Sequence, residues 1–255
     1  MYQALEMVLR VPVRVWEGRT CIFCRAASPY KIVDGRLKCR RCRRVYSLMK
    51  LRKDLEVLHH FALGLSANNC AGETGLDYKT VHKRYMSFRQ KIMDYTEQNF
   101  QKLSGELELD ETYFGGKKKG KRGRGSENKT CVFGILERNG VVYTKVVEDV
   151  SAKTLMSVIE DKTEKGSVYY TDCFKSYKSL TRYGKHNRIN KEYAWAKGHN
   201  HINGIEGFWS FAKERFHKYH GVKRNNYSLY LKELEFRFNN RNTNVFNKLI
   251  NIIYK

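Results

Sequence analysis

Three acidic residues of this 255-residue chain stand in local patterns suited to metal chemistry. Asp110 ends the alternating run GELELD, Asp172 ends the apolar run SVYYTD, and Glu206 lies in the aromatic segment HNHINGIEGFWSFAKERF. The first two runs read as strands and the third as a helix, so two strand ends and one helix could direct carboxylates to one point. Hard divalent cations prefer carboxylate ligands. The three acids therefore predict a metal site.

The chemistry expected of such a site is the cleavage of phosphodiester bonds. A pair of Mg²⁺ ions stabilises both the attacking and the leaving oxygen of an in-line displacement, and Asp110 on a central strand would be the shared ligand. Ordinary roles stay open, because Asp172 could cap the following helix and Glu206 could be a solvated residue. Glu111 should point to the opposite face of its strand and is expected to be structural.

The charge of the chain favours a polyanionic partner. Lys and Arg number 49 against 26 Asp and Glu, which gives a formal net charge of +23. A positive surface of this kind attracts DNA or RNA, with an anionic membrane as the competing polyanion. No run approaches the roughly eighteen apolar residues of a membrane span, and the N-terminus lacks the pattern of a signal peptide. We expect a cytoplasmic protein that binds nucleic acid and no membrane.

A basic, glycine-rich loop follows the Asp110 strand directly. Residues 115–125, GGKKKGKRGRG, could follow a phosphate backbone, although a solvated charged hairpin is the alternative. The cations of this loop are Lys117, Lys118, Lys119, Lys121, Arg122 and Arg124.

Four of the seven cysteines form two CxxC pairs, Cys21–Cys24 and Cys39–Cys42. Residues 25–38 separate the pairs, one residue short of the usual spacing of a four-cysteine zinc site, and Asp34-Gly35 predicts a hairpin turn between them. The pattern predicts a zinc ribbon in which bound Zn²⁺ supplies most of the folding energy, on the order of 10 kcal/mol. Free thiols, a redox pair or iron are the alternatives. Cys70, Cys131 and Cys173 are expected to be buried apolar residues.

A helical region follows the ribbon. Apolar residues at helical spacing over 55–63, with breaks at Gly64 and Gly75, predict three short helices. The turn at Gly75 and an Asp77 cap on the next helix resemble a helix-turn-helix, although a small bundle with solvated basic residues is the alternative. Residues of that helix would then face duplex DNA. They are Lys79, Thr80, His82, Lys83 and Arg84.

From Ser104-Gly105 onward the pattern changes from helical to alternating. The expected elements are strands at 106–114, 130–138 and 141–149, a helix at 152–163, a strand at 168–171, and helices at 175–182, from 203 and over 227–241. This is the order of a ribonuclease H-like domain. The predicted fold class is α/β: a ribonuclease H-like mixed-sheet catalytic domain (104–255) preceded by the zinc ribbon (1–50) and the helix-turn-helix-like domain (51–103).

Three motifs together carry a resemblance to a known family. LDETYFGGKKKGKRGRG, YYTDCFKSY and HNHINGIEGFWSFAKERF resemble the catalytic motifs of DDE-type bacterial insertion-sequence transposases, in particular the group with a zinc-ribbon head. The resemblance covers most of the chain. It implies that Asp110, Asp172 and Glu206 bind Mg²⁺ or Mn²⁺, and that strand cleavage is followed by transfer of the 3′ end. It also implies that a homodimer forms on double-stranded DNA, which comprises the element ends and the target.

The third ligand is open between two residues. Members of the group vary at this position, where asparagine is sometimes proposed to serve, so Asn203 competes with Glu206. Lys213 stands nearly two helical turns after Glu206 and so shares its face, and in similar transposases a basic residue at this offset contacts DNA. We expect Glu206 to be the ligand, because a carboxylate neutralises a divalent ion and an amide does not.

The leading hypothesis is therefore a transposase that binds the terminal inverted repeats of its own element and cuts and joins DNA. One alternative is a DNA-binding regulator derived from a transposase and catalytically silent. The other is a ribonuclease H-type nuclease or resolvase. Tyr193 and Trp195 could stack on unpaired bases, whereas Trp209 is expected in the core.

Overall fold

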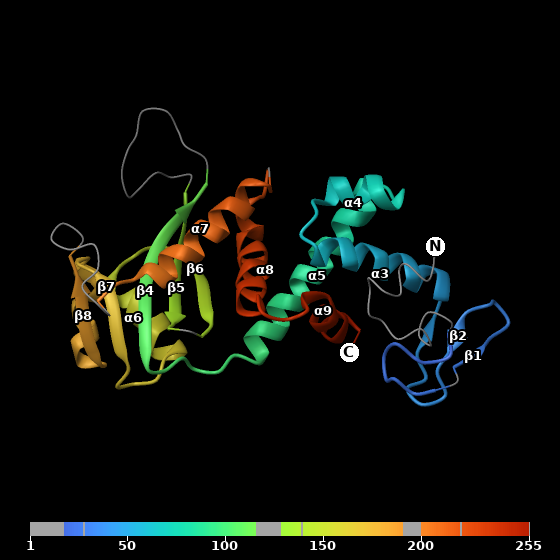
Figure 1. The fold of residues 1–255 in the computed structure, drawn as a ribbon, viewed down its shortest axis with the longest axis horizontal. Coiled ribbons are helices and arrows are strands. Elements are labelled where there is room, and N and C mark those ends of the chain that lie inside the picture. The colour runs from blue at the N-terminus through green and yellow to red at the C-terminus, as the bar shows by residue number, and fades with distance from the viewer. Residues whose placement is uncertain are drawn as a thin grey trace. The chain divides into compact units, whose positions relative to one another are not determined.

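The computed structural model describes residues 18–27, 29–115, 129–138, 140–190, 200–219 and 221–254. They fall into two compact units (Figure 1). The first unit holds the residues up to Tyr95 together with those from Asn240 onward, and the second holds Thr96–Asn239. This division differs from the predicted domains at the C-terminus, because α9 (Val245–Ile253) packs with α3 (Leu48–Ala62) in the first unit, where the His59 and Phe246 rings lie 5.4 Å apart. The three predicted domain ranges stay a prediction.

The first unit begins with a small antiparallel sheet. Its strands β1 (Tyr30–Lys31), β2 (Leu37–Lys38) and β3 (Val45–Tyr46) pair in sequence order. The predicted turn between β1 and β2 is present, since Asp34 Oδ1 accepts a hydrogen bond from the Arg36 N–H at 3.0 Å and Gly35 has φ +79°. A left-handed backbone of this kind favours glycine. The sheet is the hairpin expected of a ribbon.

Three helices follow, as predicted: α3, α4 (Ala67–Thr74) and α5 (Tyr78–Gln98). Gly75 ends α4 with φ +64°, and Asp77 Oδ2 accepts the Thr80 N–H at 3.2 Å at the start of α5. These are the helix-stop and helix-start signals read from the sequence. Helix α5 continues to Gln98 because apolar residues recur at helical spacing, and Val81, Tyr85, Phe88 and Ile92 are all buried.

The second unit contains a five-stranded mixed sheet. The order is β6-β5-β4-β7-β8, with β4 next to β5 and β7. Strands β4, β5 and β6 pair antiparallel, whereas β4, β7 and β8 pair parallel. This arrangement confirms the predicted ribonuclease H-like sheet. The strands are β4 (Glu106–Phe114), β5 (Thr130–Glu137), β6 (Val142–Val147), β7 (Val168–Asp172) and β8 (Lys185–Ile189).

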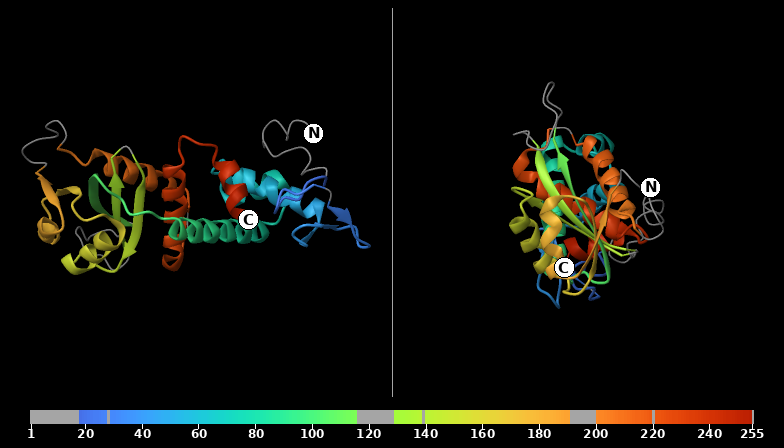
Figure 2. Two further views of the ribbon diagram at one scale, coloured as in Figure 1. Left: turned by 90° about the horizontal axis from the view of Figure 1, so that it is seen from below. Right: turned by 90° about the vertical axis from the view of Figure 1, so that its left-hand side faces the viewer.

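Helices cover both faces of this sheet (Figures 1 and 2). Leu107 and Leu109 pack in one cluster with residues of α6 (Ala152–Lys162) and of the 3-10 helix η1 (Lys175–Arg182). On the other face, Phe114 and Tyr170 pack with residues of α7 (Asn203–His217) and α8 (Tyr227–Asn239), which follows the short 3-10 helix η2 (Arg224–Asn226). Trp209 of α7 is 3% exposed, which confirms its predicted place in the core.

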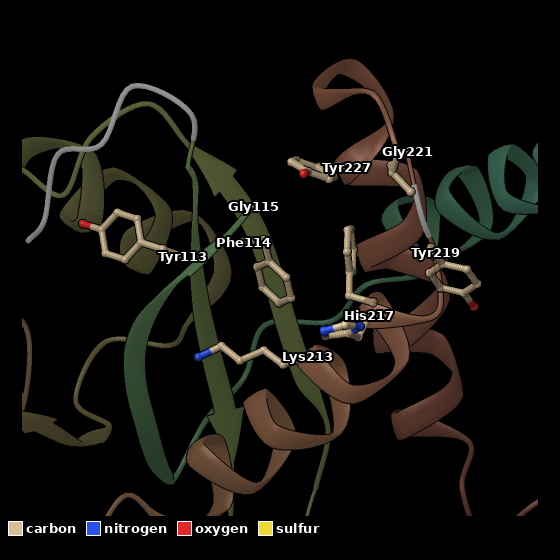
Figure 3. Close-up of a pocket in the computed structure, with 10 residues that line it drawn as sticks. Tyr113, Phe114, Gly115, Lys213, His217, Tyr219, Gly221 and Tyr227 are labelled. Carbon is tan, nitrogen blue, oxygen red and sulfur yellow. The ribbon is translucent and has the colours of Figure 1, made fainter. Parts of the chain in front are cut away.

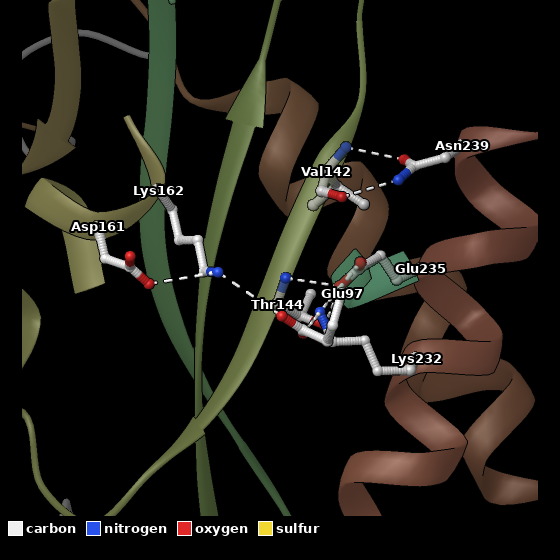
Figure 4. Close-up of polar contacts among 8 residues, drawn as sticks. All are labelled: Glu97, Val142, Thr144, Asp161, Lys162, Lys232, Glu235 and Asn239. Atoms are coloured by element: carbon white, nitrogen blue, oxygen red, sulfur yellow. Dashed lines mark hydrogen bonds and ion pairs between the residues drawn. The ribbon is translucent and has the colours of Figure 1, made fainter. Parts of the chain in front are cut away.

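Side chains of α8 bind the outer edge of β6 (Figure 4). Asn239 accepts the Val142 N–H and donates to the Val142 carbonyl, both at 2.8 Å, and Glu235 Oε2 accepts the Thr144 N–H at 2.7 Å. Lys232 Nζ lies 3.0 Å from Glu235 Oε2, so the buried carboxylate has a cation beside it. Three backbone groups of the edge strand are thereby satisfied by side chains.

None of the helices in the described part of the chain combines the length and the apolar character that a membrane crossing requires.

Candidate active site and metal centre

Asp110 and Asp172 come to adjacent positions of the sheet. Strands β4 and β7 run parallel with Glu108 paired to Tyr170, and continuing this register by two residues brings Asp110 level with Asp172. Side chains alternate between the faces of a strand, so Asp110 shares the face of Glu108, and Asp172 shares the face of Tyr170, which packs against α7. Both acids are half-buried. Both acids therefore stand two residues beyond the last paired residues of neighbouring strands, on the face that α7 covers.

Two glycines let α7 approach the sheet beside Asp110. Gly134 is the β5 partner of Asp110, and a Cβ at this position would lie 2.5 Å from the Trp209 ring. In the first turn of α7, a Cβ on Gly204 would lie 2.8 Å from Glu108 Oε2. Separations under about 3 Å are not tolerated without a shift of one partner. The absence of side chains at both positions thus sets the close packing of α7 next to Asp110.

A buried carboxylate fixes the start of α7. Glu108 is 1% exposed, and its two oxygens accept hydrogen bonds from Ile205 N at 2.9 Å and from Arg138 Nε at 3.0 Å. Arg138 also donates to the His201 carbonyl at 2.7 Å and lies over the Tyr170 ring, 3.7 Å from its centroid. The sequence interpretation missed Glu108. The run GELELD carried the signal, because it places Glu108 two residues before Asp110 on the same face.

Helix α7 starts at Asn203, as predicted. Glu206, in its first turn, is half-buried, whereas Asn203 is exposed. The Ile205 N–H donates a hydrogen bond to Glu108, which lies two residues before Asp110 on β4. The first turn of α7, which carries Glu206, is thereby held near Asp110. Lys213, two turns further along α7, is exposed. The choice between Glu206 and Asn203 as third ligand, and the DNA contact of Lys213, stay predictions.

Glu111 lies on the opposite face of β4, as predicted. It is 8% exposed and accepts a hydrogen bond from Tyr177 Oη of η1 at 2.8 Å. Burial raises the pKa of Tyr177 well above its usual value, and the negative charges of Glu111, Asp110 and Asp172 raise it further. The charges of Asp110 and Asp172 therefore act together with Glu111 against ionisation of Tyr177.

The ligand atoms of the three acids are not close enough together to form a metal-ligand group. Asp172 Oδ1 accepts the Phe174 N–H at 2.8 Å in the turn before η1, but the N-cap of η1 is Phe174 and has no side-chain cap, so Asp172 does not cap the following helix. Among the described residues, one group of three or more His, Cys, Asp or Glu side chains is spaced to hold a metal ion, and it consists of the four cysteines. The three acids do not form such a group in this structure. The backbone brings Asp110, Asp172 and the Glu206 turn together, while their role as a ligand set stays a prediction.

The four cysteines do form such a group. The Sγ atoms of Cys21, Cys24, Cys39 and Cys42 all lie within 4.8 Å of one another, with Cys21 to Cys42 at 3.7 Å and Cys24 to Cys39 at 3.5 Å. Zn–S bonds of about 2.3 Å in a tetrahedron place sulfurs about 3.8 Å apart, so the cysteines fit Zn²⁺. No disulfide joins them.

The two CxxC turns are built alike. The residue after each pair, Arg25 or Arg43, has a positive φ of 59° or 61° and donates its N–H to the carbonyl of the first cysteine, at 2.9 Å or 3.0 Å. Burial raises the pKa of Cys21 to about 12. Burial also opposes the charged form of Cys39, but the N–H of Cys42 and other hydrogen bonds outweigh it and lower the pKa of Cys39 to about 6. A partly preformed thiolate favours a bound cation.

Comparison with known proteins decides the family. Residues 102–239 match the model of the ISXO2-like transposase domain, which spans β4 to α8 and therefore all three predicted acids. The chain belongs to the ISXO2-like transposase family. An uncharacterized transposase-like protein of Haemophilus influenzae is 45% identical to this family member over 100 residues, which are 39% of this chain and 81% of that protein.

The solved structures to which this chain is similar include two integrase catalytic core domains. That of BIV integrase is 14% identical with a TM-score of 0.36, covering 52% of this chain and 84% of that one. That of HTLV-2 integrase in complex with magnesium is 10% identical with a TM-score of 0.34, covering 56% and 89%.

The predicted DNA-binding residues of this ISXO2-like family member differ in their surroundings. On α5, Lys79, Thr80 and Lys83 are exposed and His82 is half-buried. Arg84 instead pairs with Asp54 of α3 at 2.7 Å, with its side chain only 20% exposed, so its charge is engaged within the helical group. The six cations of the basic loop lie outside the described residues. Of the three other cysteines, Cys70 and Cys131 are buried as predicted, but Cys173 is exposed because it follows the end of β7.

Proposed function

We propose that this family member is a DNA transposase that binds the terminal inverted repeats of its insertion sequence and catalyses metal-dependent strand cleavage and strand transfer. The observation that carries the proposal is the register of β4 and β7. Continued by two residues, this register supports a position of Asp110 next to Asp172, on the face against which the first turn of α7 packs. The formal charge of +23 supports a DNA partner.

In this proposal Asp110, Asp172 and Glu206 hold Mg²⁺ or Mn²⁺. The bound ions would stabilise the attacking and leaving oxygens of the displaced phosphate. The chain itself orients the donors: the Phe174 N–H holds one oxygen of Asp172, and Glu108 anchors the turn that carries Glu206. A half-buried set of three carboxylates has the oxygen donors that these hard ions require.

The first unit would recognise the element end. Zn²⁺ held by the four cysteines would stabilise the ribbon, and the exposed Lys79, Thr80 and Lys83 of α5 would contact duplex DNA together with His82. Arg84 would act indirectly by holding α5 to α3 through Asp54. The cations of the basic loop would bind the phosphate backbone. Joining two element ends would take a homodimer formed on DNA, which mass measurement with and without end DNA tests.

Cleavage of element-end DNA tests the catalytic assignment. The substrate is a duplex made from inverted repeats flanking the gene, incubated with the full chain and Mg²⁺ or Mn²⁺. We expect cleavage by the wild type, and a loss of orders of magnitude in rate for Asp110→Asn and Asp172→Asn. Glu214→Gln is the matched control, since this α7 side chain is 76% exposed and points to solvent. Full cleavage by either Asp variant would falsify the assignment.

Two further substrates separate the competing functions. An RNA–DNA hybrid and a branched junction are offered under the same conditions. A transposase is expected to prefer element ends over both, whereas a ribonuclease H-type nuclease or resolvase would cut the hybrid or the junction at least as well. A silent regulator would bind element ends and cut none of the three.

A further inference from the structure

A large cavity opens in the second unit beyond the acidic residues (Figure 3). Its volume is about 740 Å³, within the range of pockets that bind small organic groups. The end of β4, the second half of α7 and the start of α8 supply its walls. None of the three predicted acids lines it.

Aromatic rings form one wall of the cavity. The Phe114 and Phe216 rings lie 4.9 Å apart, and those of Phe216 and Tyr227 lie 5.2 Å apart. Phe216 and Tyr227 are only half-buried, unlike Trp209, which is buried beneath α7. A row of partly exposed rings offers flat apolar surface to a flat aromatic ligand.

Two basic side chains stand beside these rings. Lys213 and His217 are four residues apart on α7, so they lie on one face of the helix, and both are exposed. Figure 3 shows Lys213 and His217 on the side of α7 that faces Phe114 of β4. Proteins bind unpaired nucleotides with rings that stack on the bases beside positively charged side chains such as Lys213.

The cavity also lies at a suitable distance from the acids. Phe114 is four residues beyond Asp110 on the same strand and the same face, which corresponds to about 13 Å at about 3.3 Å per residue. Stacked bases rise about 3.4 Å each, so a phosphate held at the acids would have its neighbours within about four nucleotides of the cavity.

We infer that the cavity receives a nucleobase that leaves the DNA stack within about four nucleotides of the cut. The base stacks on the wall of Phe216 and Tyr227, and Lys213 and His217 contact its flanking phosphates. The inference rests on the proposed function, since it takes the scissile phosphate to lie at Asp110 and Asp172. It adds a subsite that grips the end of the strand next to the reacting bond.

Photo-crosslinking tests where the base lies. The probe is a forked duplex with four unpaired nucleotides, in which each unpaired position carries 5-iododeoxyuridine in turn, bound to the full chain carrying Asp110→Asn so that cleavage does not intervene. We expect one position to crosslink most strongly, to the peptide that contains Phe216 or to the one that contains Tyr227. Equal yields at all positions, or crosslinks to other parts of the chain, would overturn the inference.

Substitutions test the aromatic wall and the charge of Lys213 separately. Tyr227→Leu should weaken binding of the forked duplex about fivefold or more, whereas Tyr227→Phe keeps the ring and should bind like the wild type. Lys213→Ala should remove about one phosphate contact, so the slope of the logarithm of the binding constant against the logarithm of the salt concentration should become shallower by about 0.9. Lys218→Ala is its control, because the side chain of this C-cap residue of α7 is 68% exposed and does not line the cavity. Unchanged binding by both Tyr227→Leu and Lys213→Ala would reject the subsite.

The two proposals can fail independently. Metal-dependent cleavage by the wild type reports on the proposed function and does not require the cavity. Cleavage without the position-dependent crosslink would remove the cavity subsite and leave the enzyme. The crosslink without cleavage would leave a DNA-binding cavity and remove the catalytic assignment.

Discussion

The two candidate metal centres of this chain are organised in opposite ways. In the first unit four cysteine sulfurs already lie within 4.8 Å of one another, held by two short turns of the same construction. In the second unit the carboxylates come from β4, β7 and α7, and only their backbones are brought together. The cysteine site is local, because it depends on a few residues that are neighbours in the sequence. The acidic site is assembled, because it depends on the register of the strands and on the packing position of α7. The two centres should therefore respond differently to substitution.

Removing one cysteine should give the largest effect and break the local centre. Cys39→Ser is expected to lose bound zinc and with it most of the folding energy of the ribbon, on the order of 10 kcal/mol. Zinc content per chain, measured by atomic absorption, checks this. Cys173→Ser is the control, because Cys173 is exposed and lies outside the cysteine group, and it should keep its zinc. Retention of full zinc by Cys39→Ser would contradict the ribbon.

The third ligand of the assembled centre should give the next largest effect. Glu206→Gln is expected to slow cleavage by about three orders of magnitude, roughly 4 kcal/mol of barrier, because an amide does not neutralise a divalent ion. Asn203→Ala should change the rate less than about tenfold, since Asn203 is exposed. Single-turnover rates of the two variants decide between them, and the reverse order would make Asn203 the ligand.

Substitution of Glu108 tests whether the packing position of α7 on the sheet controls the geometry of the three acids. Glu108→Gln removes the buried carboxylate beside Arg138 and leaves only the more distant, exposed Glu106, so we expect a loss of about 3 kcal/mol in unfolding free energy and faster amide exchange at the start of α7. Denaturant unfolding and hydrogen exchange measure the two effects. Glu106→Gln is the control, because this side chain is 45% exposed and its pair with Arg138 should be worth less than about 1 kcal/mol. Equal losses in both variants would argue against a special role for Glu108.

Gly134 gives the smallest and most local test. Gly134→Ala places a methyl group against the Trp209 ring, so α7 must shift, and we expect a loss of about 1–3 kcal/mol with slower cleavage. Gly207→Ala on α7 meets no atom within 4 Å and should be neutral or stabilise by up to about 1 kcal/mol. Thermal unfolding of both variants provides the comparison. If the Gly134→Ala variant were as stable as the wild type and cleaved DNA normally, a shift of α7 on the sheet would not matter for the site.

The sequence predicted the parts of the molecule that short-range signals control. The ribbon hairpin follows from Asp34-Gly35, the start of α5 from Asp77, and the strand and helix order of the second unit from changes in hydrophobic period. The opposite orientations of Asp110 and Glu111 follow from the alternation of a strand alone. These features need no knowledge of distant contacts.

The features that were missed depend on partners far away in the chain. Glu108 is recognisable as an anchor only when Arg138 and Ile205 are known to lie beside it. Arg84 has the sequence context of a DNA contact, yet its ion pair with Asp54 depends on the crossing of α3 and α5. The exposure of Cys173 depends on where β7 ends. The arrangement of the three acids could not be predicted for the same reason. Their carboxylates come from separate elements, and no local sequence pattern sets the distances between them.

The contacts of α8 with β6 limit how copies of this protein can associate. A bare outer strand acts as a template onto which a strand of a second molecule can add. Here Asn239 and Glu235 already occupy backbone groups of Val142 and Thr144, so strand addition at this rim would first have to displace an amide and a buried carboxylate. The side chains of α8 therefore disfavour the pairing of a second copy along this rim of β6.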